Sequence, residues 1–201
     1  LGKDLGGSTT GLFAAFFMAI SEAFIGRTSL GFYDTENLGI FGMVTIALFF
    51  LRSLDADRSF KERIIYGVIS GLFLGYTFAS WGATRYIVGL LILFILSVLI
   101  TGRFERRHLV SYALTLGFGL AITIFVPRLG TNFLMSIENI AAILLGILLT
   151  VSEYARNRLE ERQTAMLIGG LVLALILGVF VLEALGVANP ISDKFLRVIL
   201  P

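Results

Sequence analysis

The residues best suited to chemistry lie in one short polar segment, residues 25–36, between two apolar stretches. Asp34 and Glu36 place two carboxylates two positions apart, and Arg27 stands seven residues before Asp34. Divalent cations such as Mg²⁺ and Mn²⁺ prefer oxygen ligands, including carboxylates. A guanidinium group binds phosphate oxygens through two parallel hydrogen bonds. The segment therefore predicts a metal site beside a phosphate-binding residue.

Helix capping is an alternative interpretation of the same residues. An apolar stretch follows directly, so that Asp34 or Thr35 would be the N-cap of a helix and Glu36 would lie in its first turn. Acidic residues in these positions stabilise a helix through its dipole without any ligand. An Asp-x-Glu spacing also arises often by chance. Capping and metal binding are compatible, so both interpretations stay open at this point.

The composition limits what chemistry the chain can do. Of its 201 residues, 57% are hydrophobic and 15% are charged, whereas soluble domains contain about 25% charged residues. The absence of Cys and the single His exclude disulfide frameworks, thiol nucleophiles, Cys-bound zinc and most His-based metal sites. A net charge of +2 is too small a surplus to indicate a nucleic-acid partner. We therefore expect a membrane protein that works with carboxylates, arginines, hydroxyls or backbone groups.

Seven apolar stretches could be membrane-spanning helices, which need about 20 residues, or somewhat fewer where neighbours shield their ends. Lipid requires every backbone polar group to be bonded internally, and the long unbroken apolar runs argue against a β-barrel. The predicted fold is all-α, a polytopic transmembrane bundle of about seven helices forming one domain over residues 1–201. The predicted helices are 8–24, 37–51, 64–79, 86–101, 109–126, 135–151 and 165–182.

The Lys and Arg residues indicate which helix ends face the cytoplasm, because positive residues collect on that side. Eleven of the 16 fall in one set of connectors and five in the other. The smaller set includes Arg27, Arg85 and Arg128, so the segment 25–36 is predicted to face outside. A cation site with an arginine beside it, at an outer membrane surface, suggests a phosphorylated or pyrophosphate-linked lipid. We interpret the basic connectors of the other face as topology signals and contacts to anionic membrane lipids.

Three further residues of the outer side have open interpretations. Trp81, in the turn 80–85, is either an anchor at the level of the lipid headgroups or part of the wall of a substrate cavity. Tyr33 is a second candidate for that wall. Glu22, near the outer end of the first predicted helix, is either interfacial or turned toward the cavity.

Two sets of motifs resemble those of a known family. The string IGRTSLGFYDTEN at residues 25–37 is similar to the second outer acidic motif of the oligosaccharyltransferase catalytic subunit, Arg-(Ser/Thr)-x-x-Gly-x-(Tyr/Phe)-Asp-x-(Glu/Asp/His). SWG at residues 80–82 and TGRF at residues 101–104 resemble the family's Trp-Gly-Gly turn and Gly-Arg-(Phe/Tyr) helix end. The motifs stand in the family's order, and the resemblance covers nearly the whole chain. The lack of Cys suggests an archaeal or bacterial single-subunit relative.

The resemblance implies an activity, a fold and a set of partners. Such enzymes transfer an oligosaccharide from a polyprenyl phosphate or pyrophosphate carrier to Asn of Asn-x-Ser/Thr sequons, at the outer face of the cell membrane. By similarity, Asp34 would be a catalytic metal ligand, Glu36 a second ligand or a residue that holds the site, and Arg27 a phosphate-binding residue. The cofactor would be Mg²⁺ or Mn²⁺, which neutralises charge on the phosphate leaving group. The partners would be the lipid-linked oligosaccharide, the acceptor polypeptide, membrane lipids and the remaining parts of the parent chain, in a larger GT-C-type membrane domain.

Some parts of the family pattern are missing from this sequence. The family's first acidic motif would precede Leu1, and its sequon-reading Trp-Trp-Asp pocket would follow Pro201, so we expect an internal fragment that is inactive alone. TVSE at residues 150–153 resembles the family's Ser-Val-Ser-Glu motif, but the charge count puts Glu153 on the cytoplasmic side. Glu153 is therefore rejected as a site residue. Ala83 replaces the second glycine of the family's Trp-Gly-Gly turn.

Two other functions are compatible with the sequence. Another polyprenyl-phosphate-dependent membrane glycosyltransferase would share outer acidic loops but lack sequon recognition. A secondary transporter or channel would fit a helical bundle in which Gly67, Gly71 and Gly75 stand four residues apart, although this spacing also simply permits close helix packing. Transporters usually place ionisable groups near the membrane midplane, whereas the charges here lie at helix ends.

Overall fold

The computed structural model describes residues 1–28 and 35–156, with the short pieces 169–170, 173–174, 177–178 and 181. Helices dominate these residues, and they include no β-strand. Five helices are long and apolar enough to cross a membrane, and the bent pair α1 (Gly2–Ile20) and α2 (Glu22–Thr28) makes a sixth if it is one span. The predicted all-α transmembrane bundle is confirmed. Most of the predicted helix 165–182 lies outside the described residues.

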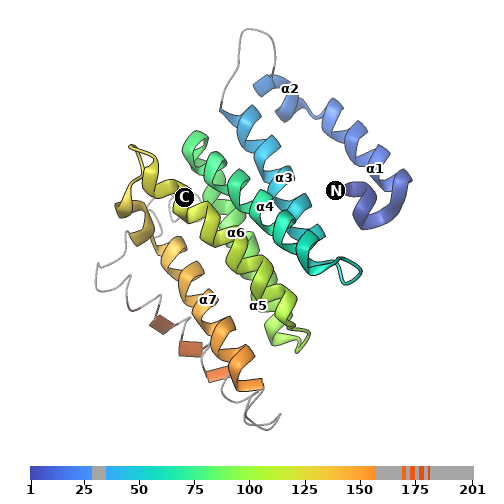
Figure 1. Cartoon of the computed structure of the whole chain (residues 1–201). Helices are drawn as coiled ribbons and strands as arrows, with labels where there is room; N and C mark the ends of the chain where they lie inside the picture. The colour runs from blue at the N-terminus through green and yellow to red at the C-terminus, as the bar shows by residue number, and fades with distance from the viewer. Residues whose placement is uncertain (29–34, 157–168, 171–172, 175–176, 179–180, 182–201) are drawn as a thin grey trace.

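The five long helices run up and down in chain order (Figure 1). They are α3 (Glu36–Leu54), α4 (Phe60–Ser80), α5 (Arg85–Ile100), α6 (Arg106–Phe125) and α7 (Ile137–Arg156). Short 3₁₀ segments, η1 (Gly82–Thr84) and η2 (Thr131–Met135), precede α5 and α7. The starts of α3, α5 and α7 therefore share one end of the bundle, called the site end below. The starts of α4 and α6 share the other, called the basic end.

The helices extend past their predicted limits mainly at the basic end. There α3, α4, α6 and α7 each continue three to five residues beyond the apolar stretch that predicted them. Hydropathy marks only the part of a helix that lipid surrounds, whereas the helix itself continues to its cap. At the start of α4 that cap is a capping box, in which Ser59 and Glu62 each accept a hydrogen bond from the other's backbone N–H.

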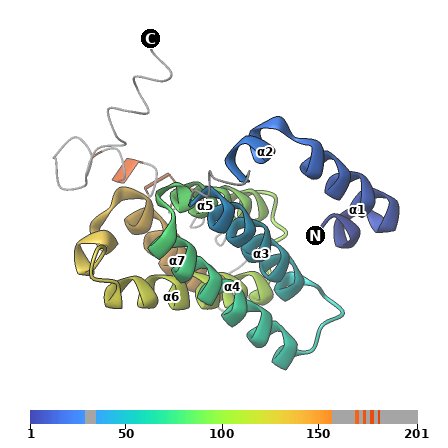
Figure 2. The same cartoon turned by 90° about the horizontal axis from the view of Figure 1, so that it is seen from above.

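The prediction of one continuous helix over residues 8–24 is wrong. The chain leaves α1 at Ser21 and turns by 59° into α2, so that Glu22 and Arg27 lie on a short separate helix. Near its start, α1 also contains two non-helical residues, Gly6 and Gly7, and Gly7 has a φ of 84° that favours glycine. None of the residues of α1 is buried, and the helix lies at the edge of the bundle in both views (Figure 1, Figure 2).

Small residues let the central helices approach closely. A Cβ at Gly67, Gly71 or Gly75 of α4 would lie 2.6–3.0 Å from atoms of α6, including Cβ atoms of Leu114 and Ile122. These glycines are helix-packing positions, as small residues usually are between membrane helices. The feature that supported the transporter hypothesis therefore has a structural role.

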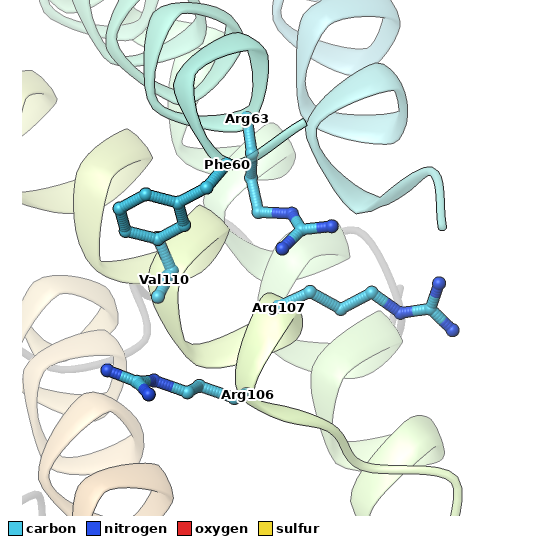
Figure 3. A pocket seen from close by; sticks show the side chains of 5 residues that line it. All are labelled: Phe60, Arg63, Arg106, Arg107 and Val110. Atoms are coloured by element: carbon cyan, nitrogen blue, oxygen red, sulfur yellow. The ribbon is translucent and has the colours of Figure 1, made fainter. Parts of the chain in front are cut away.

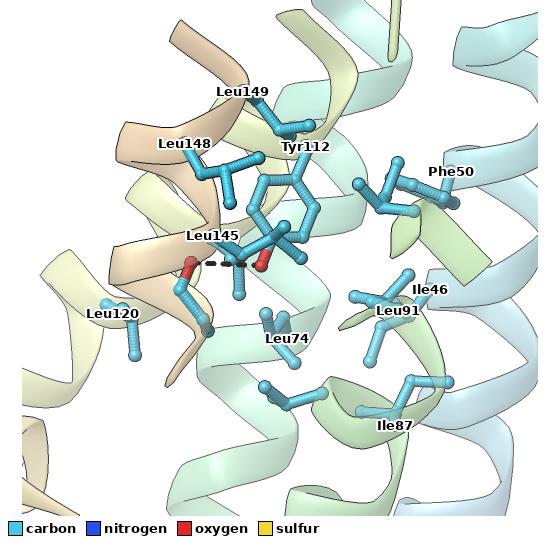
Figure 4. Packing of buried hydrophobic residues seen from close by; sticks show 14 of the residues in the cluster. Ile46, Phe50, Leu74, Ile87, Leu91, Tyr112, Leu120, Leu145, Leu148 and Leu149 are labelled. Carbon is cyan, nitrogen blue, oxygen red and sulfur yellow. Dashed lines mark hydrogen bonds between the residues drawn. The ribbon is translucent and has the colours of Figure 1, made fainter. Parts of the chain in front are cut away.

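The core lies where α3, α4, α5, α6 and α7 meet (Figure 4). Tyr112 of α6 is its largest fully buried side chain, and its hydroxyl donates a 3.0 Å hydrogen bond to the carbonyl oxygen of Ala142 in α7. Ser70 donates to the carbonyl of Ile46, and Ser111 to that of Ser53. These hydroxyls join neighbouring helices through backbone acceptors, which fixes how the helices stand relative to one another.

The TGRF string at residues 101–104 ends α5. Gly102 has a φ of 69°, and the N–H groups of Gly102 and Arg103 donate to the carbonyls of Leu99 and Val98, which is the Schellman pattern. Phe104 then turns inward, where only 3% of it is exposed, and its carbonyl accepts a hydrogen bond from Arg156 of α7. The string therefore has a structural role at the basic end.

Candidate functional site

Arg27 and Glu36 form an ion pair at the site end. Arg27 lies in the last turn of α2 and Glu36 is the first residue of α3, with Nη1 of Arg27 3.1 Å from Oε1 of Glu36. The pair joins the two ends of the segment that the sequence singled out. Asp34 and Tyr33, between them, lie outside the described residues. The structure therefore brings Arg27 and Glu36 together and leaves Asp34 and Tyr33 as predictions.

The second carboxylate oxygen of Glu36 has the character of a ligand. Oε2 of Glu36 is buried and has no hydrogen-bond partner among the described residues, and the same holds for Oδ1 of the neighbouring Asn37. A buried acceptor without a donor is costly to maintain, and both a cation and a donor group would satisfy it. Within the described residues no three His, Cys, Asp or Glu side chains converge into a metal site. Glu36 thus fits as one ligand of a hard cation.

Glu36 also satisfies the capping interpretation. Thr35 is the N-cap of α3 and Glu36 lies in its first turn, where the helix dipole favours a negative charge. The capping position leaves the carboxylate available for a ligand, because one oxygen binds Arg27 and the other has no hydrogen bond within the described structure.

Arg27 and Glu22 line one open hollow of about 530 Å³ on α2, together with Ala23 and Gly26. The four positions are spaced so that they share a helix face. Glu22 is exposed and borders this hollow beside Arg27, which is compatible with both interpretations of Glu22. This hollow is wide enough to admit a headgroup-sized ligand beside the Arg27–Glu36 pair.

Trp81 packs against the first turn of α3. It ends α4, and a Cβ added to Gly39 would overlap its indole ring. Since Gly39 stands three residues after Glu36, both lie on neighbouring positions of one helix face. The turn after Trp81 is fixed by Thr84, which is fully buried and whose hydroxyl donates to the carbonyls of Thr77 and Trp81 at 2.9 and 2.7 Å. Trp81 is therefore a rigid neighbour of the Glu36 helix start.

A second polar cluster at the site end was missed at the level of sequence. Nε of Arg85 lies 3.1 Å from Oε1 of Glu138 at the start of α7, and its guanidinium stands over the Phe133 ring at 5.5 Å. Asn139 is fully buried, and its Nδ2 donates a 2.9 Å hydrogen bond to the carbonyl of Phe133. In the sequence, Arg85 and Glu138 each stand near the start of an apolar stretch that follows a polar turn. Arg85 alone indicated only how the chain is oriented in the membrane.

Glu153 lies at the basic end, far along α7 from its start at the site end. There it lines a hollow of about 250 Å³ with Glu105, Arg106 and Arg156. This position agrees with the rejection of Glu153 as a partner of Asp34 and Glu36.

Fold and site together define a class of protein: a polytopic all-α membrane domain that gathers an arginine, a carboxylate and a tryptophan at one end of its helices. The family model described as "Oligosaccharyl transferase STT3, N-terminal" matches residues 1–199. The chain belongs to the STT3 family.

Individual relatives agree with this assignment. The chain is 31% identical over 202 residues to the "Dolichyl-diphosphooligosaccharide--protein glycosyltransferase subunit stt-3" of Caenorhabditis elegans, covering 97% of this chain and 26% of the relative. It is 30% identical over 151 residues to subunit STT3A of Oryza sativa subsp. japonica, covering 75% of this chain and 19% of that protein. Subunit STT3 of Saccharomyces cerevisiae is 24% identical over 200 residues, covering 96% of this chain and 27% of that protein. The matched region thus spans about a fifth to a quarter of the length of these relatives.

Proposed function

We propose that this chain is part of the membrane domain of an oligosaccharyltransferase, which transfers a lipid-linked oligosaccharide to Asn of Asn-x-Ser/Thr sequons. The observation that carries the proposal is the Arg27–Glu36 ion pair, because it joins a phosphate-binding group and a carboxylate within the family-like motif. The names of the relatives, which are dolichyl-diphosphooligosaccharide–protein glycosyltransferase subunits, support the same activity.

In this proposal each residue at the site end has a separate task. Arg27 holds Oε1 of Glu36 through Nη1, and a guanidinium, with its five N–H donors, is also suited to bind phosphate oxygens of the lipid carrier. Glu36, held in this way, offers Oε2 to a divalent cation, with Asp34 as the other ligand from the segment. A bound Mg²⁺ or Mn²⁺ would neutralise the negative charge that develops on the phosphate leaving group. Trp81 and Tyr33 form part of the cavity wall.

The proposal puts the site end at the outer face of the cell membrane. Its support is the distribution of positive residues, because most of the Lys and Arg residues lie in the connectors of the basic end. Labelling of a single Cys introduced at Asn132, in the exposed η2 turn of the site end, tests this orientation. A membrane-impermeant thiol reagent should label it in intact cells and should not label a Cys at Asp57, in the turn before α4.

A transfer assay with the full-length protein that contains this chain tests the activity. The substrates are a lipid-linked oligosaccharide and two peptides, one with an Asn-x-Ser/Thr sequon and one with Ala in place of Ser/Thr. We expect Asp34→Ala and Glu36→Gln each to lower kcat/KM by about 100-fold or more, the size of effect seen when a preorganised charge-stabilising group is removed. Asp57→Asn, which removes an exposed carboxylate at the basic end, should leave it within twofold.

Two outcomes would contradict the proposal. If Asp34→Ala left turnover and metal dependence intact, the assignment of the segment 25–36 would be wrong. If both peptides accepted glycan equally well, the protein would be a polyprenyl-phosphate-dependent glycosyltransferase without sequon recognition.

A further inference from the structure

A basic hollow of about 320 Å³ lies at the basic end between the first turns of α4 and α6 (Figure 3). Its lining consists of Phe60, Arg63, Arg106, Arg107 and Val110. Three of the five side chains are arginines, and no carboxylate belongs to the lining. In Figure 3 Arg63 descends from α4 toward the start of α6, and Arg106 and Arg107 leave α6 in opposite directions. The arginines thus surround the hollow with positive charge, although the Arg106 and Arg107 guanidinium groups point away from each other.

Little of this positive charge is neutralised within the described structure. Arg63 donates to the carbonyl oxygens of Ser53 and Asp55 at 3.0 and 3.4 Å, and these neutral acceptors leave its charge in place. Arg106 forms no hydrogen bond or ion pair with the residues that the structure describes. Each guanidinium thus keeps donors for an anion.

Arg107 is the one lining arginine that has a carboxylate partner among the described residues. Its Nη2 lies 2.7 Å from Oε1 of Glu105, but its Nε is buried and has no hydrogen-bond partner in the same part of the chain. The other carboxylates nearby are Glu62, which binds Ser59 and Arg58, and Glu153, which shares the adjacent hollow with Arg106 and Arg156. A buried donor without an acceptor is the complement of a negatively charged oxygen.

The apolar side of the hollow indicates what kind of anion fits. Phe60 is 58% exposed, and Val110 is partly buried beside it. Both stand in the first turn or two of membrane-spanning helices, at the depth where lipid headgroups meet acyl chains. Clusters of arginines at this depth attract anionic lipids. A soluble phosphate would contact the arginines and gain nothing from Phe60, whereas a lipid would use both.

We propose that this hollow is a binding site for an anionic phospholipid, with the headgroup phosphate in the positive surroundings that Arg63, Arg106 and Arg107 create and an acyl chain against Phe60 and Val110. The site is at the opposite end of the bundle from Glu36, and it depends neither on the transfer reaction nor on the metal. Its lipid would hold α4 and α6 together at their starts, where both helices border the hollow.

Native mass spectrometry of the full-length protein in detergent tests the site, with phosphatidylglycerol as the anionic probe and phosphatidylcholine as the zwitterionic one. We expect Arg106→Gln to weaken phosphatidylglycerol binding about fivefold, as the loss of one charge-assisted hydrogen bond implies. Arg103→Gln is the matched control, because Arg103 is an exposed arginine of the same end that does not line the hollow. It should change binding by less than twofold, and phosphatidylcholine should bind more weakly than phosphatidylglycerol.

The other outcomes distinguish a bound lipid from diffuse attraction and from a free phosphate ester. Equal losses in Arg106→Gln and Arg103→Gln would mean diffuse surface attraction and would overturn the proposal, as would equal binding of the two lipids. Phe60→Ala removes the apolar wall and leaves every arginine, so it should weaken phosphatidylglycerol binding about threefold through lost apolar contact. If Phe60→Ala had no effect and glycerol phosphate displaced the lipid, the hollow would bind a free phosphate ester and the lipid assignment would fail.

Discussion

The two ends of the bundle differ in which polar atoms they leave unpaired. Among the described residues, the buried side-chain oxygens without a hydrogen bond gather at the site end, on Glu36, Asn37, Ser136 and Asn139, and Oε1 of Glu138 there has only its ion pair with Arg85. The basic end instead leaves a donor, Nε of Arg107. Buried polar groups without a hydrogen bond are rare in folded proteins and often mark a place where a ligand or ion binds. The contrast agrees with the two proposals, a cation at the site end and an anion at the basic end.

The ion pairs of the two ends also differ in whether they join separate helices or residues close in sequence. At the site end Arg27 and Arg85 each bind a carboxylate at the start of another helix, Glu36 and Glu138. At the basic end Arg58 and Arg107 bind carboxylates within four residues, and the hydrogen bond with Glu62 raises the pKa of the Arg58 guanidinium. The exception there is Arg52, which binds Asp4 and ties α3 to α1. At the site end the ion pairs connect different helices, whereas at the basic end most of them connect residues within a turn or a helix start.

Replacing one arginine at each end should give the largest difference in activity. In the proposed site Arg27→Ala would remove a phosphate donor as well as the partner of Glu36, so we expect a loss of about 10- to 100-fold in kcat/KM, the cost of one or two charge-assisted hydrogen bonds. Arg58→Ala at the basic end should cost less than twofold, since its partners are local. The transfer assay measures both. Arg27→Lys should recover only part of the activity, because an ammonium group cannot hold Glu36 and phosphate in the same fork.

This prediction has a clear point of failure. If Arg27→Ala and Arg58→Ala lowered transfer equally, the Arg27–Glu36 pair would be a structural contact only and the contrast between the two ends would not concern catalysis.

The packing of Trp81 on Gly39 gives the next largest effect. Gly39→Ala would force the new methyl group into the indole ring, and overpacking of this kind costs about 1–3 kcal/mol. Gly89→Ala in α5 is the matched control, because a Cβ there meets nothing within 4 Å and alanine favours the helix by up to about 1 kcal/mol. Denaturant unfolding in micelles measures both variants. A Gly39→Ala protein as stable as the Gly89→Ala protein would show that the indole moves away at no cost, and Trp81 would not be a fixed wall of the site.

The hydrogen bond of Tyr112 joins the helices between the two ends. Tyr112→Phe removes the only side-chain hydroxyl that the described structure shows binding the Ala142 carbonyl, so we expect a loss of about 1 kcal/mol in the free energy of unfolding. Tyr76→Phe serves as control, because Tyr76 is exposed and its hydroxyl makes no hydrogen bond to the described residues. Equal stability of the two variants, measured by the same unfolding assay, would mean that packing alone holds α7 on α6.

The sequence predicted much of the fold because lipid simplifies the problem. An apolar stretch of about 20 residues has to be a helix in a bilayer, and this constraint was sufficient for the helices α3 to α7. It could not predict the break at Ser21, because the predicted stretch 8–24 runs through it without a proline and the bend comes from the extended backbone of Ser21. It also made the helices too short at the basic end, because capping by residues such as Ser59 and Glu62 is independent of hydropathy.

The candidate site was predictable only where its residues are close in sequence. Arg27 and Glu36 stand nine residues apart in one motif, and the structure brings them together. Arg85 and Glu138 are separated by two helices, so nothing local connects them before the bundle is assembled. Trp81 was a candidate from its type and turn, but its contact with Gly39 depends on the packing of α4 against α3. Residue type and spacing are sufficient to predict a local motif, whereas pairs between helices become visible only in the folded structure.

The Arg85–Glu138 pair gives the smallest expected effect. It tests whether an ion pair that joins two helices is stronger than one between residues close in sequence. Arg85 is more than half exposed and Glu138 is mostly covered, so solvent screens much of the attraction and a double-mutant cycle with Arg85→Gln and Glu138→Gln should give a coupling of about 0.5 kcal/mol. The same cycle on Arg58 and Glu62, an exposed pair four residues apart, should give a smaller coupling, because solvent surrounds both partners. Raising the salt concentration should weaken the exposed pair more strongly, because a partly covered carboxylate is screened less. A coupling for Arg85–Glu138 that is no larger than that of Arg58–Glu62, and equally sensitive to salt, would mean that the pairs between helices at the site end have no special strength, and that the unpaired acceptors alone distinguish this end.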